Sequence, residues 1–140
     1  MRKNLIAIVL TLLLCVPALA ACGGDDGPPE AENPADVAKR LQEAGYVTGE
    51  VITDGANVGV ARGGKLDADA YLSVDADPEG EPLYVGIYFF STPEDAEVLG
   101  QERQSNIDRD FDAQVIGDRV YEIAGAPADL ALVIGAAEGS

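Results

Sequence analysis

The chain has 140 residues, with 25 acidic side chains against 9 basic ones and a formal net charge of −16 at pH 7. This length suits a single domain. Such a negative charge repels phosphate backbones and anionic lipid headgroups, which argues against nucleic acid as a partner. Histidine is absent, so Ser-His and Cys-His catalytic pairs and histidine metal ligands are excluded.

The amino-terminal segment has the layout of an export signal. Residues 1–4 form a short positive head, residues 5–16 are apolar apart from Thr11, and Pro17 ends the apolar run. A charged head, a short apolar core and small residues after it are typical of secretory signals. The alternative is an uncleaved membrane-spanning helix, which usually needs about 20 apolar residues. Pro17 and the alanines after it fit a cleavage region better.

The end of this segment, Leu19-Ala20-Ala21-Cys22, resembles the lipobox of bacterial lipoproteins. The resemblance implies that residues 1–21 are a signal peptide and that Cys22 carries acyl chains such as palmitate after cleavage. Two or more acyl chains suffice for stable anchoring. It also implies a lipid-anchored protein on the outer face of the cell membrane. Because Gly23 and not Asp follows the cysteine, an outer-membrane location is also open in a diderm host.

Residues 23–33 are mostly Gly, Pro and acidic residues, without an aliphatic or aromatic side chain larger than Ala. A segment of this composition cannot bury enough surface to offset its ordering entropy. We therefore predict a lipid-anchored, flexible acidic tether over residues 22–34 and a single domain over residues 35–140.

Three helices are predicted in the domain. The first begins after Asn33, which can cap it, with Pro34 in the first turn. Thr92 and Pro93 repeat this start signal for a helix that runs to about residue 104. The third is expected over residues 127–137, where apolar side chains recur at helical spacing.

The strands are expected between these helices. Residues 83–90 are uncharged and rich in aromatic and β-branched types, which favours a central strand. Gly117-Asp118 predicts a hairpin between residues 111–116 and 119–124, and Asp54-Gly55 predicts another between residues 46–53 and 56–61. Residues 70–74 are expected to pair with residues 83–90 across a turn.

This order of elements predicts an α+β fold with two layers, an antiparallel or mixed sheet with helices packed on one face. The unit from residue 83 to residue 116 leaves one alternative open. It could form a right-handed crossover between parallel strands.

Acidic side chains alternate in the turn after residue 74, at Asp75, Asp77 and Glu79. Oxygen ligands at this spacing resemble the start of a calcium loop, but the twelfth position is Gly86 and not a bidentate Glu. An EF-hand is thus excluded. We favour a solvated acidic turn and keep a weak calcium site as the alternative; no other cofactor is predicted.

Tyr84, Tyr88 and Phe90 share one face of the predicted central strand. Such a stripe most often belongs to the core beneath helices. If that face is partly open, the three side chains are the best candidate contact surface.

Two weaker patterns complete the candidates. Residues 59–65 have the spacing of a phosphate loop, but Leu66 replaces the required Ser or Thr, so a turn is favoured. Arg103, Arg109 and Arg119 are expected to be solvated counter-charges, unless they converge on an anionic ligand.

The anchor, the tether and the lack of a catalytic pattern predict a non-enzymatic binding or accessory module of the cell envelope. Its expected partners are the membrane, through the lipid anchor, and an envelope protein or a small ligand. The alternative is a small extracytoplasmic enzyme that uses carboxylates alone, such as a glycan hydrolase. A transporter's solute-binding lipoprotein is disfavoured, because those proteins usually have two lobes and greater length.

Overall fold

The computed structural model describes residues 31–53, 59–61, 66–105 and 111–140. Its helices are α1 (Pro34–Glu43), α2 (Pro93–Ser105) and α3 (Pro127–Glu138). Its strands are β1 (Val47–Thr48), β2 (Gly59–Ala61), β3 (Leu66–Asp67), β4 (Ala70–Ala76), β5 (Pro82–Phe89), β6 (Phe111–Ile116) and β7 (Arg119–Ala124). None of the helices in these ranges is long and apolar enough to cross a membrane.

The helix start signals form as the sequence predicts. Asn33 Oδ1 accepts a hydrogen bond from the Ala35 N–H at 3.0 Å, which caps α1. Thr92 Oγ1 accepts from the Asp95 N–H at 3.3 Å and donates to the Asp95 carboxylate at 3.0 Å. These bonds satisfy amide groups that a first helical turn otherwise leaves without partners.

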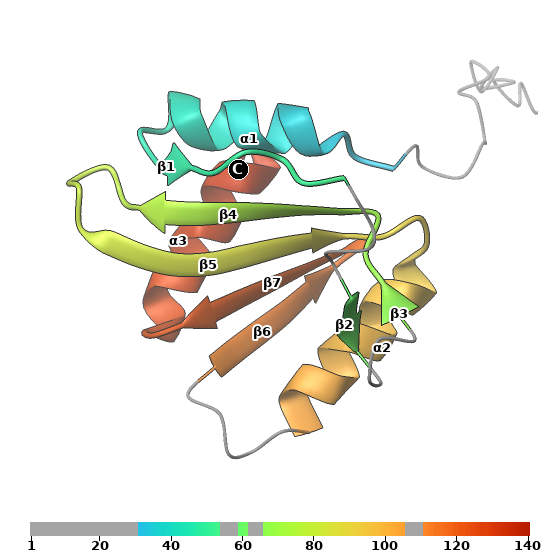
Figure 1. Ribbon diagram of the computed structural model, residues 1–140. Coiled ribbons are helices and arrows are strands. Elements are labelled where there is room, and N and C mark those ends of the chain that lie inside the picture. The colour runs from blue at the N-terminus through green and yellow to red at the C-terminus, as the bar shows by residue number, and fades with distance from the viewer. Residues whose placement is uncertain (1–30, 54–58, 62–65, 106–110) are drawn as a thin grey trace, which may run out of the picture.

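The main sheet has the strand order β1-β4-β5-β7-β6, and all of its pairings are antiparallel (Figure 1). The prediction of a central strand is confirmed, because β5 pairs with β4 on one side and with β7 on the other. Since β5 and β6 both run antiparallel to β7, they run in the same direction. Helix α2 therefore joins two parallel strands that β7 separates.

The β6–β7 hairpin forms as predicted around Gly117-Asp118, but the pairing expected around Asp54-Gly55 is wrong. β1 pairs with β4, and β2 pairs with β3 in a separate two-stranded sheet. The segment after β1 stays along β4, where Ile52 and Tyr71 exchange two backbone hydrogen bonds of 2.9 Å. Pairing along the sheet outweighs the local turn signal, which lies outside the described residues.

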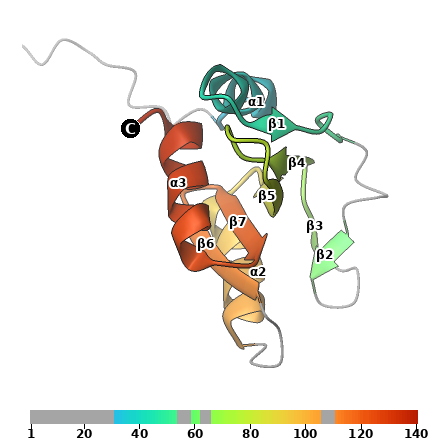
Figure 2. The same cartoon turned by 90° about the vertical axis from the view of Figure 1, so that its left-hand side faces the viewer.

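The predicted α+β class, with helices packed against the sheet, is confirmed, but the helices cover both faces. α1 and α3 bury one face, together with alternate residues of β4, β5 and β7. α2 packs on the opposite face against β6 and β7, near the β2–β3 ribbon. Figure 2 shows α3 on one side of the sheet and the ribbon on the other. Both faces need cover because Val120 and Tyr121 are consecutive, point to opposite faces and are both buried.

The two edges of the main sheet differ in how they are protected. β1 contributes only two residues at one edge. β6 forms the other edge. Because the two-residue hairpin pairs Ile116 with Arg119, alternate residues of β6 bond to β7, and the N–H group of Ala113 points away from β7. The Asp112 Oδ1 atom accepts that N–H at 3.0 Å.

Two helix glycines provide a matched test of this packing. A Cβ atom on Gly100 would lie 2.2 Å from the Val115 Cγ2 atom, whereas one on Gly135 would meet only Ser140 Oγ at 3.9 Å. We expect Gly100→Ala to lower the free energy of unfolding by about 1–2 kcal/mol, because overpacking outweighs the gain in helix propensity. Gly135→Ala should raise it by about 0.5 kcal/mol.

Urea unfolding of both variants measures the difference. Equal stability of the two variants would contradict the close contact of α2 with β6.

Candidate functional site

The first candidate site is a cavity of about 390 Å³ on the face of the sheet that carries α2. It lies over β4, β5 and β7, beyond the part of this face that α2 covers. The strand register arranges its lining side chains in three rows. These rows are Tyr71 and Tyr88, then Ser73, Gly86 and Glu122, then Asp75, Tyr84 and Ala124.

Gly86 allows the close approach of an aromatic ring to the sheet. A Cβ atom on Gly86 would lie 2.9 Å from Tyr71 Cε2, so the absent side chain leaves room for the Tyr71 ring to lie over Gly86. The Tyr71 ring centroid lies 4.9 Å from that of Tyr88, with the ring planes tilted by 48°. Tilted aromatic pairs at this separation are favourable. The two rings thus form one fixed wall of the cavity.

Glu122, which lines the cavity, forms a buried ion pair with Arg103 of α2. Arg103 Nε donates to Glu122 Oε2 at 2.8 Å, and the two side chains are only 13% and 11% exposed. A buried carboxylate needs such a partner, because an unpaired one would carry a large desolvation penalty. Arg103 thereby neutralises Glu122 and links the end of α2 to β7.

Two tyrosines of the cavity have a raised pKa. Burial raises the pKa of Tyr71, and the charges of Asp75 and Glu122 raise it further. Burial also raises the pKa of Tyr88, where Glu122 adds to the shift and Arg103 opposes it. Both shifts favour the neutral phenol of Tyr71 and of Tyr88 beside the carboxylates.

The structure divides the predicted contact surface. Tyr84 is 72% exposed at the rim of the cavity, and the half-buried Tyr88 lines it. Phe90 is only 2% exposed and belongs to the core with Ala96 and Leu99 of α2. Tyr71 is not among the residues predicted for this surface, although it lies on a predicted strand. Its spacing of two residues from Ser73, and of four from Asp75, indicates that the three side chains share one face of the strand.

The three predicted calcium ligands do not converge. Asp75 lines the tyrosine cavity, whereas Asp77 and Glu79 line a second cavity of about 320 Å³ beside Tyr46. A register shift between Val74 and Ala76 interrupts the strand here. Asp77 Oδ1 accepts the N–H groups of Glu79 and Glu81 at 2.9 and 2.8 Å, so this carboxylate closes the turn. Among the described residues, no three side chains of metal-ligating type lie together.

Other predicted features lie wholly or partly outside the described residues. These are the lipobox with Cys22, residues 62–65 of the phosphate-loop pattern, and Arg109. Residues 59–61 of that pattern form strand β2.

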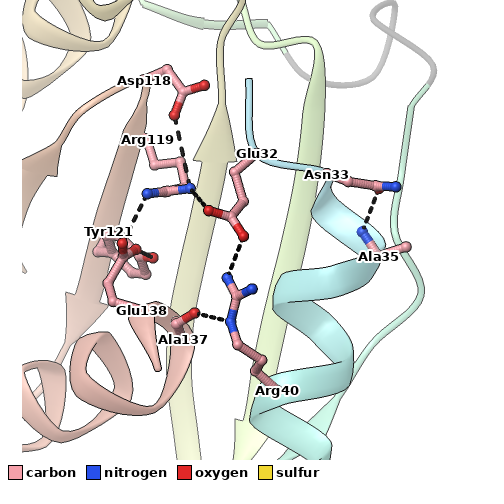
Figure 3. Close-up of polar contacts among 9 residues, drawn as sticks. All are labelled: Glu32, Asn33, Ala35, Arg40, Asp118, Arg119, Tyr121, Ala137 and Glu138. Atoms are coloured by element: carbon pink, nitrogen blue, oxygen red, sulfur yellow. Dashed lines mark hydrogen bonds and ion pairs between the residues drawn. The ribbon is translucent and has the colours of Figure 1, made fainter. Parts of the chain in front are cut away.

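Arg103 and Arg119 do not converge on one point, because each pairs with different carboxylates. Arg119 is only 8% exposed, and its two terminal nitrogens contact Glu32 at 3.0 Å and Glu138 at 2.9 Å (Figure 3). The Glu138 carboxylate also accepts the Tyr121 hydroxyl. Burial raises the pKa of Tyr121, and its hydrogen bond to Glu138 raises it further.

Glu32 ties the start of the described chain to this network. One oxygen of its carboxylate lies 2.6 Å from Arg40 of α1, and the other lies 3.0 Å from Arg119 of β7. Arg40 also donates to the Ala137 carbonyl at the end of α3, at 2.6 Å. In Figure 3 the Glu32 carboxylate lies between the two guanidinium groups. We name the group Glu32, Arg40, Arg119, Tyr121 and Glu138 the Glu32 network.

Comparison of the chain with protein-family models, with curated proteins and with solved structures finds no match.

The Glu32 network predicts a pH-dependent stability. The hydrogen bond from Arg40 lowers the pKa of Glu32 from its usual 4.5, burial partly opposes this shift, and Arg119 adds to it. The unfolded chain therefore binds this proton more readily than the folded one. The stabilisation is complete above pH 4.5 and is lost as the pH falls through the lowered pKa.

We expect Glu32→Gln to lower the free energy of unfolding by about 1 kcal/mol at pH 7, since the carboxylate is partly exposed. The difference from wild type should shrink below pH 4.5. Urea unfolding between pH 3 and pH 7 checks this. Glu43→Gln is the control, because its pair with Lys39 is exposed at 3.8 Å and should change stability by less than about 0.5 kcal/mol. A constant difference at all pH values would contradict the prediction.

Proposed function

We propose that the protein is a lipid-anchored module of the bacterial cell envelope that binds a partner through the tyrosine-lined cavity. The observation that carries the proposal is the cavity on the α2 face of the sheet, which Tyr71, Tyr84 and Tyr88 line together with Gly86. Binding sites are typically concave, lined by aromatic side chains and supplied with a few polar groups. Ser73, Asp75 and Glu122 are such groups.

The anchoring part of the proposal rests on the amino-terminal sequence. The lipobox-like Leu19-Ala20-Ala21-Cys22 follows an apolar core of suitable length. The described residues begin at residue 31, inside the predicted tether of residues 22–34, and there Glu32 pairs with Arg40 of α1 and Arg119 of β7. A membrane attachment at Cys22 would therefore reach the domain at the Glu32 network.

An enzyme that uses two carboxylates remains the second candidate, because Asp75 and Glu122 line the same cavity. A glycan hydrolase needs one acid to protonate the leaving group and one carboxylate to act as base or nucleophile. Glu122 is buried and accepts a hydrogen bond from Arg103, which suits a structural ion pair. We therefore favour binding. Turnover of envelope glycans that Asp75→Asn abolishes would favour the enzyme.

The proposal is tested by crosslinking in intact cells followed by mass spectrometry. We expect acyl chains on Cys22 of the wild type, and loss of the membrane-bound form in Cys22→Ala. Tyr84→Ser should lose the crosslinked partner without a change in thermal midpoint, because the ring is 72% exposed. Leu132→Ser is the matched control, since Leu132 is 65% exposed on α3 and lines the other cavity.

Two results would overturn the proposal. An unmodified Cys22 with residues 1–21 retained would remove the anchor. A partner lost in Leu132→Ser and kept in Tyr84→Ser would remove the cavity as the binding site.

A further inference from the structure

The basic side chains of the described residues are all paired with carboxylates. These pairs are Lys39 with Glu43 at 3.8 Å, Arg40 with Glu32 at 2.6 Å, Arg103 with Glu122 at 2.8 Å, and Arg119 with Glu138 at 2.9 Å. Their charges are therefore neutralised within the domain. None of them lies against Asp75 at the rim of the tyrosine cavity.

The cavity consequently carries one negative charge that the described residues do not balance. Its charged lining residues are Asp75 and Glu122, and Arg103 neutralises the second. Asp75 is exposed and lines the cavity together with Tyr84, and the residues that precede Asp75 and follow Tyr84, Val74 and Val85, are paired. A cation held by Asp75 would thus lie next to the exposed ring of Tyr84.

A carboxylate beside aromatic rings has a defined chemical preference. The face of a tyrosine ring attracts a cation, and the ring also packs against an alkyl stem. An ammonium or guanidinium group on an alkyl chain meets both requirements. A bare metal ion lacks the stem, and an anion would be repelled by Asp75.

We infer that the tyrosine cavity binds the side-chain cation of a lysine or arginine carried by a partner polypeptide. The inference rests on the proposed binding function and names its ligand class. A polypeptide is favoured over a free small cation for two reasons. One ammonium group fills only a part of about 390 Å³, and the ring of Tyr84 extends beyond the hollow with 72% of its surface exposed. Residues that flank the basic side chain would cover that ring.

The test is an NMR titration of the full-length protein, purified as cells produce it, in a non-ionic detergent. The probe is an alanine pentapeptide with one central lysine, and its matched control carries Nε-acetyl-lysine in that place. We expect the lysine peptide to shift the resonances of Tyr71, Asp75 and Tyr84. Acetylation removes the ion pair and the cation–π contact together, so affinity should fall about ten-fold.

Variants of the protein separate a local site from the general acidity of the domain. Asp75→Asn should weaken the lysine peptide about three-fold to ten-fold, whereas Glu97→Gln, an equal change of charge on the exposed side of α2, should change it less than about two-fold. Tyr84→Phe should keep the affinity and Tyr84→Ser should lose it. Asp75, Tyr84 and Glu97 are exposed, so these variants should keep the thermal midpoint of the wild type.

Four outcomes would overturn the inference. The acetylated peptide could bind as well as the charged one, or Glu97→Gln could weaken binding as much as Asp75→Asn. Spermidine could also bind more tightly than the peptide with the same dependence on Asp75, which would make a free polyamine the ligand. If the peptide does not bind while Tyr84→Ser still loses the partner in cells, this inference fails and the proposed function stands.

Discussion

The structure depends on one constraint, which is that the central strands are apolar on both of their faces. In β7, Val120 faces α2 while Tyr121 and Ile123 face α1 and α3, and all three are buried. Helices α1 and α3 bury the first face. Among the described residues, the second face carries α2, which packs on β6 and β7, and the short β2–β3 ribbon. The tyrosine cavity lies on that second face over β4, β5 and β7.

Charge is arranged to match this division. The described basic side chains hold elements together, with Arg103 between α2 and β7 and Arg119 between β7, α3 and the segment before α1. Removing one partner of a buried pair would leave the other charge buried without compensation, which destabilises the folded state. The remaining acidic side chains lie at the surface, including Asp75 at the rim of the cavity. There they attract cations and repel anions that come near the domain.

The sequence predicted the helices and most strands because their signals are local. Asn33, Thr92 and Gly117 act through contacts with neighbours in the chain, and the structure bears them out. The partners of β1 and β2, the side of the sheet that α2 occupies and the Glu32 network depend on residues far apart in sequence. Two of the tyrosines that line the cavity, Tyr84 and Tyr88, were predicted from the sequence, since they share a strand face. The third, Tyr71, could not be placed with them, because its ring meets Gly86 only through the register of β4 against β5.

The protection of the sheet edges has a consequence for how such molecules behave when crowded together. A free edge strand can act as a template on which another chain adds a strand, and this growth is the usual route to fibrous aggregates. Here one edge is formed by the two residues of β1 and a single further bridge at Ile52, and at the other Asp112 Oδ1 accepts the Ala113 N–H, one of the amides that a new strand would need. Both features disfavour the addition of a strand from a second copy of the domain when copies are crowded together.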